Sequence, residues 1–379
     1  MTRIGFLGAF SIENAGDQLL GYAVRQVFEE RLPKAEQRLF APELRGAFWR
    51  HAWDERRGLG APITRVPIDG TSWTKGLDAV VIGGGAILRL EPEFRPFVLG
   101  DPRRWSRDVP AAWNALGAEA TPAYLAAHRA DCDRVAQCCD KLAYASVRNE
   151  LTARFVRRCG YRGDLHVVPD PTLLIETPDD DFAERTLRAS GVDTSAYVLG
   201  LSVGTSLRDA RAQHFHQELF STLAKLVAKG TLEVVLFPFG EVYGDSELAR
   251  MAHSAIPGSK LLDASLSALE RWRLVGGLDF YLCARWHAML AAFAQDVPFL
   301  VMDEYLSDVT ASSKIREFVA DTDLEELYLA PLVSMRPALK LDNALSIVGA
   351  EDYSFAPRLS AMRERLRRHY DALIGALHL

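Results

Sequence analysis

Residues 279–302 read DFYLCARWHAMLAAFAQDVPFLVM, in which a longer apolar segment separates two short apolar runs. The runs at 279–283 and 298–302 have the length of buried strands, and the segment at 285–294 has the length of a helix. Two strands that are joined by a helix form a parallel βαβ unit. The stretch therefore predicts an α/β fold built on a parallel sheet.

The same alternation of short apolar runs and longer amphipathic segments extends toward both ends of the chain. Asp17, next to Gly16, is predicted to cap the first helix. The acidic stretch at 176–193 is predicted to be a linker. Further strands are expected at 3–10, 77–82, 111–116, 141–147, 165–168, 197–203 and 232–237, and helices at 18–32, 122–139, 150–159, 213–228 and 355–377.

The length of 379 residues predicts two domains, because a single hydrophobic core stops growing before that size. We expect two Rossmann-like open α/β domains that face a cleft, the first at 1–178 and the second at 179–350. The residues at 351–379 are expected to form a basic amphipathic helix that bridges back to the N-terminal domain. Packing with a solvated basic face is favoured over docking on a membrane.

Composition excludes several classes of function. The 44 basic and 50 acidic side chains give a net charge of −6, which argues against a surface for nucleic acid along the chain. The N-terminus reads as a first strand, and no apolar run approaches a membrane span, so we expect a cytoplasmic protein with at most peripheral membrane contact. Five cysteines without a CxxC pair indicate neither a disulfide framework nor a zinc site, so no metal is expected.

Four residues that can bind or protonate an anion lie at predicted strand ends or helix starts. Arg148 follows one strand, Arg285 and His287 follow another, and Lys314 lies further along the chain. An arginine fork can bind a carboxylate or a phosphate, and histidine is the usual proton-transfer group near neutral pH. The alternatives are a surface ion pair for Arg148, a structural role for His287 and a solvated helix start at Lys314.

A second group of candidates lies in turns that follow strands. Turns that contain glycine let a ligand approach the backbone, and acidic side chains can bind sugar hydroxyls. Turns or helix caps without a bound ligand would account for the same residues. Trp105 and Trp113 are candidates for stacking on a sugar, although buried aromatic residues are commoner. The turn candidates are Asn14, Asp17, Gly84, Gly85, Glu241 and Asp245.

Six short motifs, taken in order, resemble those of the polysaccharide pyruvyltransferase family. They are NAGD at 14–17, GGG at 83–85, SVRNELT at 146–152, VPDPTLL at 168–174, CARWHAML at 283–290 and SSKIREF at 312–318. The resemblance implies a glycosyltransferase-B-like fold and the transfer of pyruvyl from phosphoenolpyruvate to two sugar hydroxyls as a ketal. Phosphoenolpyruvate is expected as a co-substrate without a further cofactor, and the absence of HExxH, P-loop and Cys/His zinc patterns favours a reaction without a metal.

By the same resemblance, the donor site contains Arg148, Arg285, His287 and Lys314. From the chemistry of these residue types we expect His287 to be the general acid and base, and the three cations to bind the donor anion. The acceptor is expected to be a lipid-linked or nucleotide-linked saccharide of exopolysaccharide or cell-surface glycan biosynthesis. Asn149 and Trp286 depart from the family pattern of an acid and an aliphatic residue.

Two other functions and the oligomeric state stay open at this point. A nucleotide-sugar glycosyltransferase of the same fold would need a nucleotide pocket in the second domain, for which Gly204-Thr205-Ser206 gives faint support. A catalytically silent sugar-binding protein is the third possibility. The sequence leaves both a monomer and a homo-oligomer open.

Overall fold

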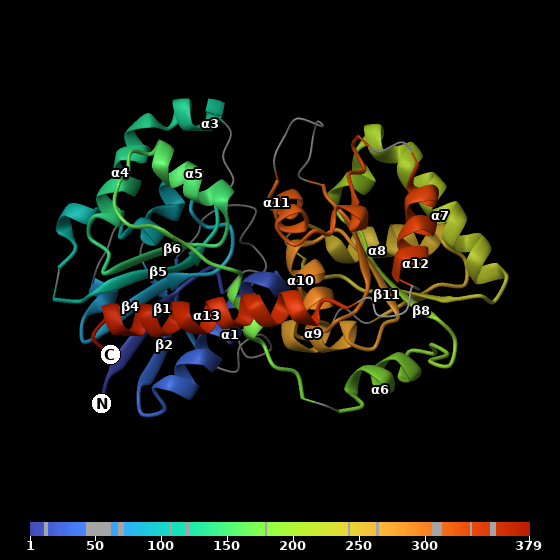
Figure 1. The fold of residues 1–379 in the computed structure, drawn as a ribbon, viewed down its shortest axis with the longest axis horizontal. Coiled ribbons are helices and arrows are strands. Elements are labelled where there is room, and N and C mark those ends of the chain that lie inside the picture. Colours follow the sequence, from blue (N-terminus) through green and yellow to red (C-terminus); the bar gives the residue numbers. More distant parts are fainter. Residues whose placement is uncertain are drawn as a thin grey trace. The chain divides into compact units, whose positions relative to one another are not determined.

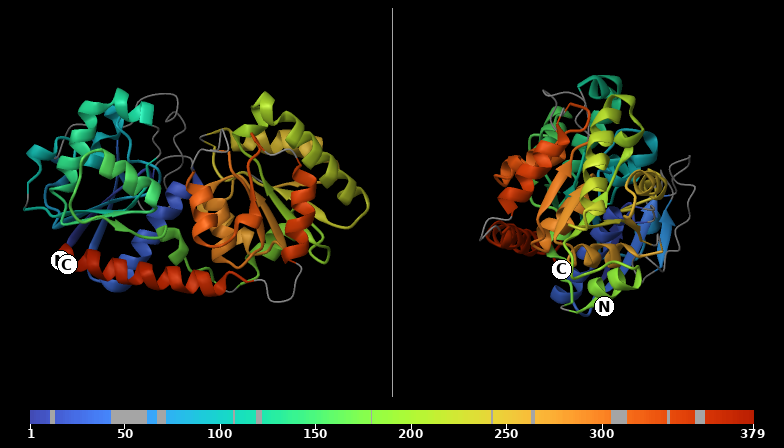
Figure 2. Two further views of the ribbon diagram at one scale, coloured as in Figure 1. Left: turned by 45° about the horizontal axis from the view of Figure 1, so that its top comes forward. Right: turned by 90° about the vertical axis from the view of Figure 1, so that its right-hand side faces the viewer.

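The computed structural model describes residues 1–10, 14–42, 62–66, 72–106, 108–118, 122–178, 180–241, 243–262, 265–304, 313–333, 336–348 and 354–379. The chain forms two compact units, each an α/β structure with helices on both faces of its sheet (Figures 1 and 2). Unit 1 comprises Met1–Glu13, Asp17–Ile175 and Ala361–Leu379, and unit 2 comprises Asn14–Gly16 and Glu176–Ser360. The predicted α/β fold with two Rossmann-like sheets is confirmed.

Unit 1 contains a parallel sheet of seven strands in the order β3-β2-β1-β4-β5-β6-β7. Its central strands are runs of buried apolar residues, as expected for a parallel sheet that is covered on both faces. The order reverses direction between β1 and β4. The strands are β1 (Arg3–Leu7), β2 (Glu36–Pro42), β3 (Ile63–Val66), β4 (Ala79–Gly83), β5 (Ala111–Leu116), β6 (Tyr144–Val147) and β7 (His166–Val167).

The helices of unit 1 correct two predictions. The first helix begins at Ala15, so Asp17 lies in its first turn and does not cap it. The predicted helix at 122–139 is interrupted at His128, whose backbone is not helical. The helices are α1 (Ala15–Arg31), α3 (Pro122–Ala127), α4 (Arg129–Cys139) and α5 (Glu150–Arg158), with short 3-10 turns η2 (Ser72–Thr74), η3 (Pro92–Val98), η4 (Pro102–Arg104) and η5 (Pro171–Leu174).

Trp105 and Trp113 belong to the interior of unit 1. Both are buried, and their indole N–H groups donate to backbone carbonyls, Trp105 to Val109 at 2.9 Å and Trp113 to Phe97 at 3.0 Å. A buried indole whose N–H is bonded in this way stabilises the core. The core interpretation of the two tryptophans is therefore confirmed.

Unit 2 contains a parallel sheet of six strands in the order β10-β9-β8-β11-β12-β13. Counted within the unit, this is the strand order 3-2-1-4-5-6 of a doubly wound dinucleotide-binding sheet. The order reverses between β8 and β11. The strands are β8 (Val198–Ser202), β9 (Glu233–Leu236), β10 (Lys260–Leu261), β11 (Phe280–Cys283), β12 (Phe299–Met302) and β13 (Tyr328–Leu329).

The helices of unit 2 include one inside the stretch at 176–193 that was predicted to be a linker. This helix, α6, buries Leu187 and contacts α9. The helices are α6 (Phe182–Ala189), α7 (Gln213–Ala228), α8 (Asp245–Ala255), α9 (Ala268–Val275), α10 (Trp286–Ala294), α11 (Lys314–Asp321) and α12 (Pro337–Val348), with 3-10 turns η6 (Thr205–Arg208), η7 (Ala210–Ala212) and η8 (Glu325–Leu327).

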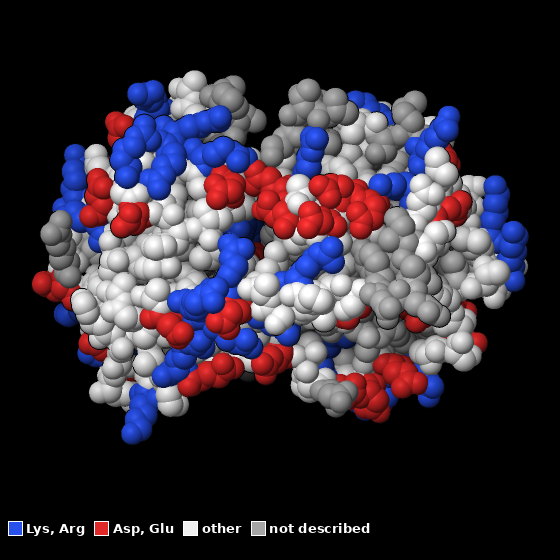
Figure 3. Space-filling model, in the orientation of Figure 1, with Lys and Arg blue, Asp and Glu red and all other residues white. Residues whose placement is uncertain are grey.

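The last helix, α13 (Ala356–Ala376), is amphipathic as predicted. Leu359, Leu366 and Leu373 are buried, whereas basic side chains gather on its outer face (Figure 3). Its arginines stay solvated or bond to nearby backbone, as Arg363 does to Leu173 at 2.8 Å. In the described part of the chain, no helix combines the length and the hydropathy that a membrane crossing needs.

A buried polar network holds α13 on the sheet of unit 1. The imidazole of His369 lies 2.9 Å from the Asn114 side-chain oxygen and 3.1 Å from the Tyr144 hydroxyl, and Asn114 donates to the Tyr370 hydroxyl at 3.1 Å. Burial lowers the pKa of His369 to about 3. The network therefore requires a neutral imidazole.

This network predicts an acid-sensitive stability. In the unfolded state His369 becomes protonated below about pH 6.5, whereas in the folded state it becomes protonated only near pH 3. The unfolding free energy therefore falls as the pH drops through this range. When the pH is lowered from 7 to 5, titration of His369 should reduce the unfolding free energy of the wild type by about 2 kcal/mol. The His369→Gln variant lacks this contribution, so its unfolding free energy should fall by about 2 kcal/mol less. Urea unfolding at the two pH values measures this difference, and equal losses in both proteins would contradict the assignment.

Candidate active site

In each unit, candidate residues lie where the sheet reverses its strand order. Ligands of doubly wound folds bind at the carboxyl ends of the strands that flank this reversal. In unit 2 these ends carry Arg285 after β11 and Gly204 after β8, and in unit 1 they carry Gly84 and Gly85 after β4. The sequence candidates thus fall at the expected edge of each sheet.

Arg285 is fixed in unit 2 by a carboxylate and an aromatic ring. Its Nε donates to Asp245 Oδ2 at 3.1 Å, its Nη2 donates to Asp245 Oδ1, and its guanidinium lies 4.5 Å from the centre of the Tyr243 ring. Asp245 is buried at the start of α8, and burial raises its pKa while Arg285 acts in the opposite direction. The pair orients a partly buried cation.

His287 packs against the first residues of α1 that belong to unit 2. It is buried in the first turn of α10, and a Cβ atom on Gly16 would overlap its ring, with Cγ only 2.5 Å away. The Asn14 side-chain oxygen accepts from the Gly16 N–H at 3.1 Å, and the Ala15 N–H donates to Phe239 O at 3.1 Å. Two motifs that lie far apart in the sequence therefore meet at His287.

Lys314 is the first residue of α11, also in unit 2. Ser313 caps this helix, accepting from the Arg316 N–H at 3.0 Å and donating to Asp303. Lys314 is only 7% exposed, so it is not the solvated helix start that was the alternative interpretation. Ser312, which belongs to the same sequence motif, lies outside the described residues.

In unit 1 the glycine motif adjoins an acid of the first helix. Gly84 and Gly85 have φ values of 106° and 72°, which other residues adopt rarely. A Cβ atom on Gly85 would overlap the Asp17 carboxylate. The structure therefore brings Asp17 and Gly85 together and explains why glycine stands at this turn.

Arg148 lies in unit 1 in a buried ion pair. Its Nη1 is 3.4 Å from Asp170 Oδ2, and the two side chains are 2% and 1% exposed. Asp170 also accepts from the Thr172 N–H at 3.1 Å, and Gly117 leaves room for the guanidinium. The pair joins the SVRNELT motif to VPDPTLL. It corrects the alternative interpretation of Arg148, which placed such an ion pair at the surface. A direct role in donor binding stays a prediction.

The remaining candidates and departures have structural partners. Glu241 accepts from the Ser246 N–H at 3.4 Å and so contacts the first turn of α8, as a cap would. Asn149 caps α5 by accepting from the Thr152 N–H at 2.9 Å. Trp286 is buried against Phe318, with ring centres 5.6 Å apart. Both departures therefore have local structural roles.

Sequence reasoning missed a second polar cluster in unit 2. Glu304 Oε1 accepts from the Ser206 N–H at 3.2 Å and from the Ser206 hydroxyl at 2.7 Å, and that hydroxyl is 3.0 Å from His216 Nε2. Glu304 follows β12 by two residues, so its place at a strand end was the available signal. His216 lies among apolar neighbours on α7, and this pattern indicated burial only.

Within the ranges that the structure describes, no three His, Cys, Asp or Glu side chains are grouped so as to hold a metal ion. His214 and His216, two residues apart, do not share a face, since His216 is buried and the side chain of His214 is 76% exposed. The five cysteines are buried free thiols.

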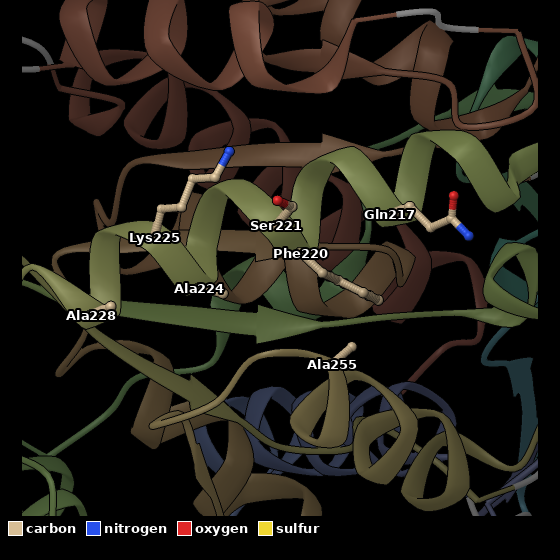
Figure 4. A pocket seen from close by; sticks show the side chains of 7 residues that line it. All are labelled: Gln217, Phe220, Ser221, Ala224, Lys225, Ala228 and Ala255. Carbon is tan, nitrogen blue, oxygen red and sulfur yellow. The ribbon is translucent and has the colours of Figure 1, made fainter.

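A surface depression lies elsewhere in unit 2, between α7 and α8 (Figure 4). Its lining includes a single charged side chain, Lys225, so it offers little to a doubly charged anion. The lining residues are Gln217, Phe220, Ser221, Ala224, Lys225, Ala228 and Ala255.

The sequence profile of the polysaccharide pyruvyl transferase family matches residues 14–304. The chain belongs to this family. The match runs from Asn14 to Glu304 and so contains His287, Arg285, Arg148 and Asp245, whereas Lys314 lies beyond it. The predicted family is confirmed, and it is a family of transferases.

Comparison with solved structures gives the fold. The chain is similar to UDP-GlcNAc 2-epimerase from Methanocaldococcus jannaschii, with 13% identity, a TM-score of 0.56 and coverage of 93% of this chain and 94% of that one. It is also similar to the MnaA–UDP structure from S. aureus, with 9% identity, a TM-score of 0.56 and coverage of 96% and 90%. These likenesses support the glycosyltransferase-B-like fold alone. The curated proteins include no significant match.

Proposed function

We propose that the chain transfers the pyruvyl group of phosphoenolpyruvate to two hydroxyls of a saccharide and forms a cyclic ketal without a metal ion. The observation that supports this most is the pairing of a fixed cation with an imidazole at one strand end. Arg285 is oriented by Asp245, and His287 follows two residues later with its ring against Gly16. Membership of the family supports the pyruvyl chemistry.

The donor carries a carboxylate and a phosphate, so its site needs cations that are oriented in advance. In unit 2 we assign this role to Arg285 and Lys314. The ion pair with Asp245 offsets part of the charge of Arg285 but fixes the direction of its N–H groups. Arg148 in unit 1 is the third proposed anion binder.

The reaction requires proton transfers that His287 is placed to perform in this proposal. The first sugar hydroxyl adds its oxygen to the enol carbon of the donor and loses its proton, while the methylene carbon gains a proton and becomes a methyl group. The bond between the former enol carbon and the phosphate oxygen then breaks, and phosphate leaves. The second hydroxyl adds to the same carbon and loses its proton, which completes the ketal.

Replacing His287 by glutamine is expected to lower turnover about 10²–10⁴-fold, because positioned acid and base groups contribute this much. Phosphoenolpyruvate should still bind, since the cations remain. Phosphate release from the donor measures turnover, and circular dichroism checks the fold. His214→Gln, an exposed change on α7, is the matched control. A fully active His287 variant would remove this residue from the mechanism.

The proposed function is tested with phosphoenolpyruvate that is isotope-labelled in its pyruvyl carbons. The protein is incubated with this donor and a panel of UDP-linked and lipid-linked saccharides, and mass spectrometry follows the label. Transfer of the label to a saccharide with release of equimolar phosphate is expected. Transfer of a sugar from a UDP-sugar, with the donor label unchanged, would support a glycosyltransferase instead.

A further inference from the structure

A hydrogen-bonded chain of three buried or partly buried groups leads to the proposed donor site in unit 2. His216 Nε2, the Ser206 hydroxyl and Glu304 Oε1 are linked at 3.0 and 2.7 Å, and Glu304 Oε2 accepts from the Thr205 hydroxyl at 3.3 Å. Gly204 completes the turn, because a Cβ atom there would overlap the Glu304 carboxylate. The loop after β8 is thus shaped around this carboxylate.

The groups that act on Glu304 are those of the Arg285 cluster. Among the described residues, Arg285 from the start of α10 and Asp245 from α8 act on it through their charges, and Ser206 acts through hydrogen bonds. One cation therefore acts on both acids through its charge, and Arg271 acts on Asp245 in the same way. A donor anion that binds beside Arg285 would bring further negative charge to this cluster, and like charges at short range disfavour ionisation.

Of the two acids, Glu304 is the one suited to accept a proton. Asp245 is held by two N–H groups of Arg285, which favour its ionised form, whereas Glu304 is bonded to hydroxyls and one backbone N–H. Burial raises the pKa of both acids, so burial does not distinguish them. The two N–H groups of Arg285 are the reason why Asp245 is expected to remain charged.

The Ser206–His216 pair can serve both protonation states of Glu304. A hydroxyl both donates and accepts, and a neutral imidazole donates or accepts at Nε2 according to its tautomer. Burial lowers the pKa of His216 to about 4, so it is neutral near pH 7. With Glu304 ionised, Ser206 donates to the carboxylate. With Glu304 protonated, the carboxyl donates to Ser206, which in turn donates to His216.

We propose that Glu304 is the proton-accepting group of the donor site and takes up a proton when phosphoenolpyruvate binds beside Arg285, with Ser206 and His216 as positioning residues. This inference rests on the proposed function, because it requires that donor. It places a proton beside the donor, whose methylene carbon must gain one during the transfer.

Calorimetric titration with phosphoenolpyruvate in two buffers of different ionisation enthalpy counts the protons taken up on binding. We expect Glu304→Gln to take up fewer protons than the wild type, by up to about one per donor bound. Glu247→Gln, which changes an exposed acid of the same unit, should match the wild type. Equal uptake in the wild type and Glu304→Gln would overturn the inference while the donor site stands.

A second variant keeps the inference testable if Glu304→Gln does not fold. Ser206→Ala removes a hydrogen bond that favours the ionised carboxylate, so the acid limb of the uptake profile should move to higher pH. An unchanged profile would overturn the inference. Absence of phosphoenolpyruvate binding by the wild type would instead defeat the proposed function, and this inference with it.

Discussion

Gly16→Ala is expected to lower pyruvyl transfer about 100-fold or more while the fold persists. A Cβ atom at this position would overlap the His287 imidazole, with Cε1 2.6 Å and Cγ 2.5 Å away, so the ring must move. Displacement of a catalytic group by about 1 Å costs about 10²-fold in rate. Alanine is a better helix former than glycine, so α1 itself is not weakened.

Phosphate release from phosphoenolpyruvate in the presence of the acceptor measures the effect. Gly375→Ala is the matched control, because a Cβ atom on this glycine of α13 would meet open space and its φ is not positive. Its activity should equal that of the wild type. Full activity of Gly16→Ala would show that the contact between NAGD and His287 is not needed for the reaction.

Arg148→Ala is expected to destabilise the protein by about 3–5 kcal/mol, since removal of one partner leaves the other charge buried and unpaired. The pair with Asp170 is almost fully buried, so solvent screens it little. Urea unfolding measures the loss. Arg158→Ala, on the exposed side of α5, should change stability by less than about 0.5 kcal/mol.

The double variant Arg148→Ala/Asp170→Ala separates charge from packing. Because it removes both charges, it should recover part of the stability that Arg148→Ala loses. If Arg148→Ala unfolded at the same urea concentration as the wild type, this result would contradict a stabilising buried pair. The donor affinity of the variant is then measured under conditions in which the variant is folded.

Most of the fold could be predicted because the central strands are continuous apolar runs. The central strands β4, β8 and β11 are almost wholly buried, and parallel sheets with helices on both faces produce such runs. Strands β2, β3, β10 and β13 escaped prediction, whereas the edge strand β7 was predicted at 165–168. β10 and β13 have two residues each, and β2 begins with Glu36-Gln37-Arg38, whose polarity hides a strand.

The candidate site could be predicted only in part, because strand ends are visible in a sequence and pairings between them are not. Arg285 and His287 could be located at the end of a strand. That Asp245 binds Arg285 and that Gly16 contacts His287 depends on the order of strands in the sheet and on the entry of α1. Glu304 and Ser206 are separated by 98 residues and meet through the neighbouring ends of β8, β11 and β12.

Calorimetric titration of the protein with phosphoenolpyruvate, with UDP and a set of UDP-sugars titrated in parallel, tests the central claim most directly. The account predicts saturable binding of phosphoenolpyruvate that Arg285→Gln weakens by about 1.5–3 kcal/mol, the contribution of a charged hydrogen bond. Binding of the nucleotides alone would contradict it and would favour a nucleotide-sugar glycosyltransferase.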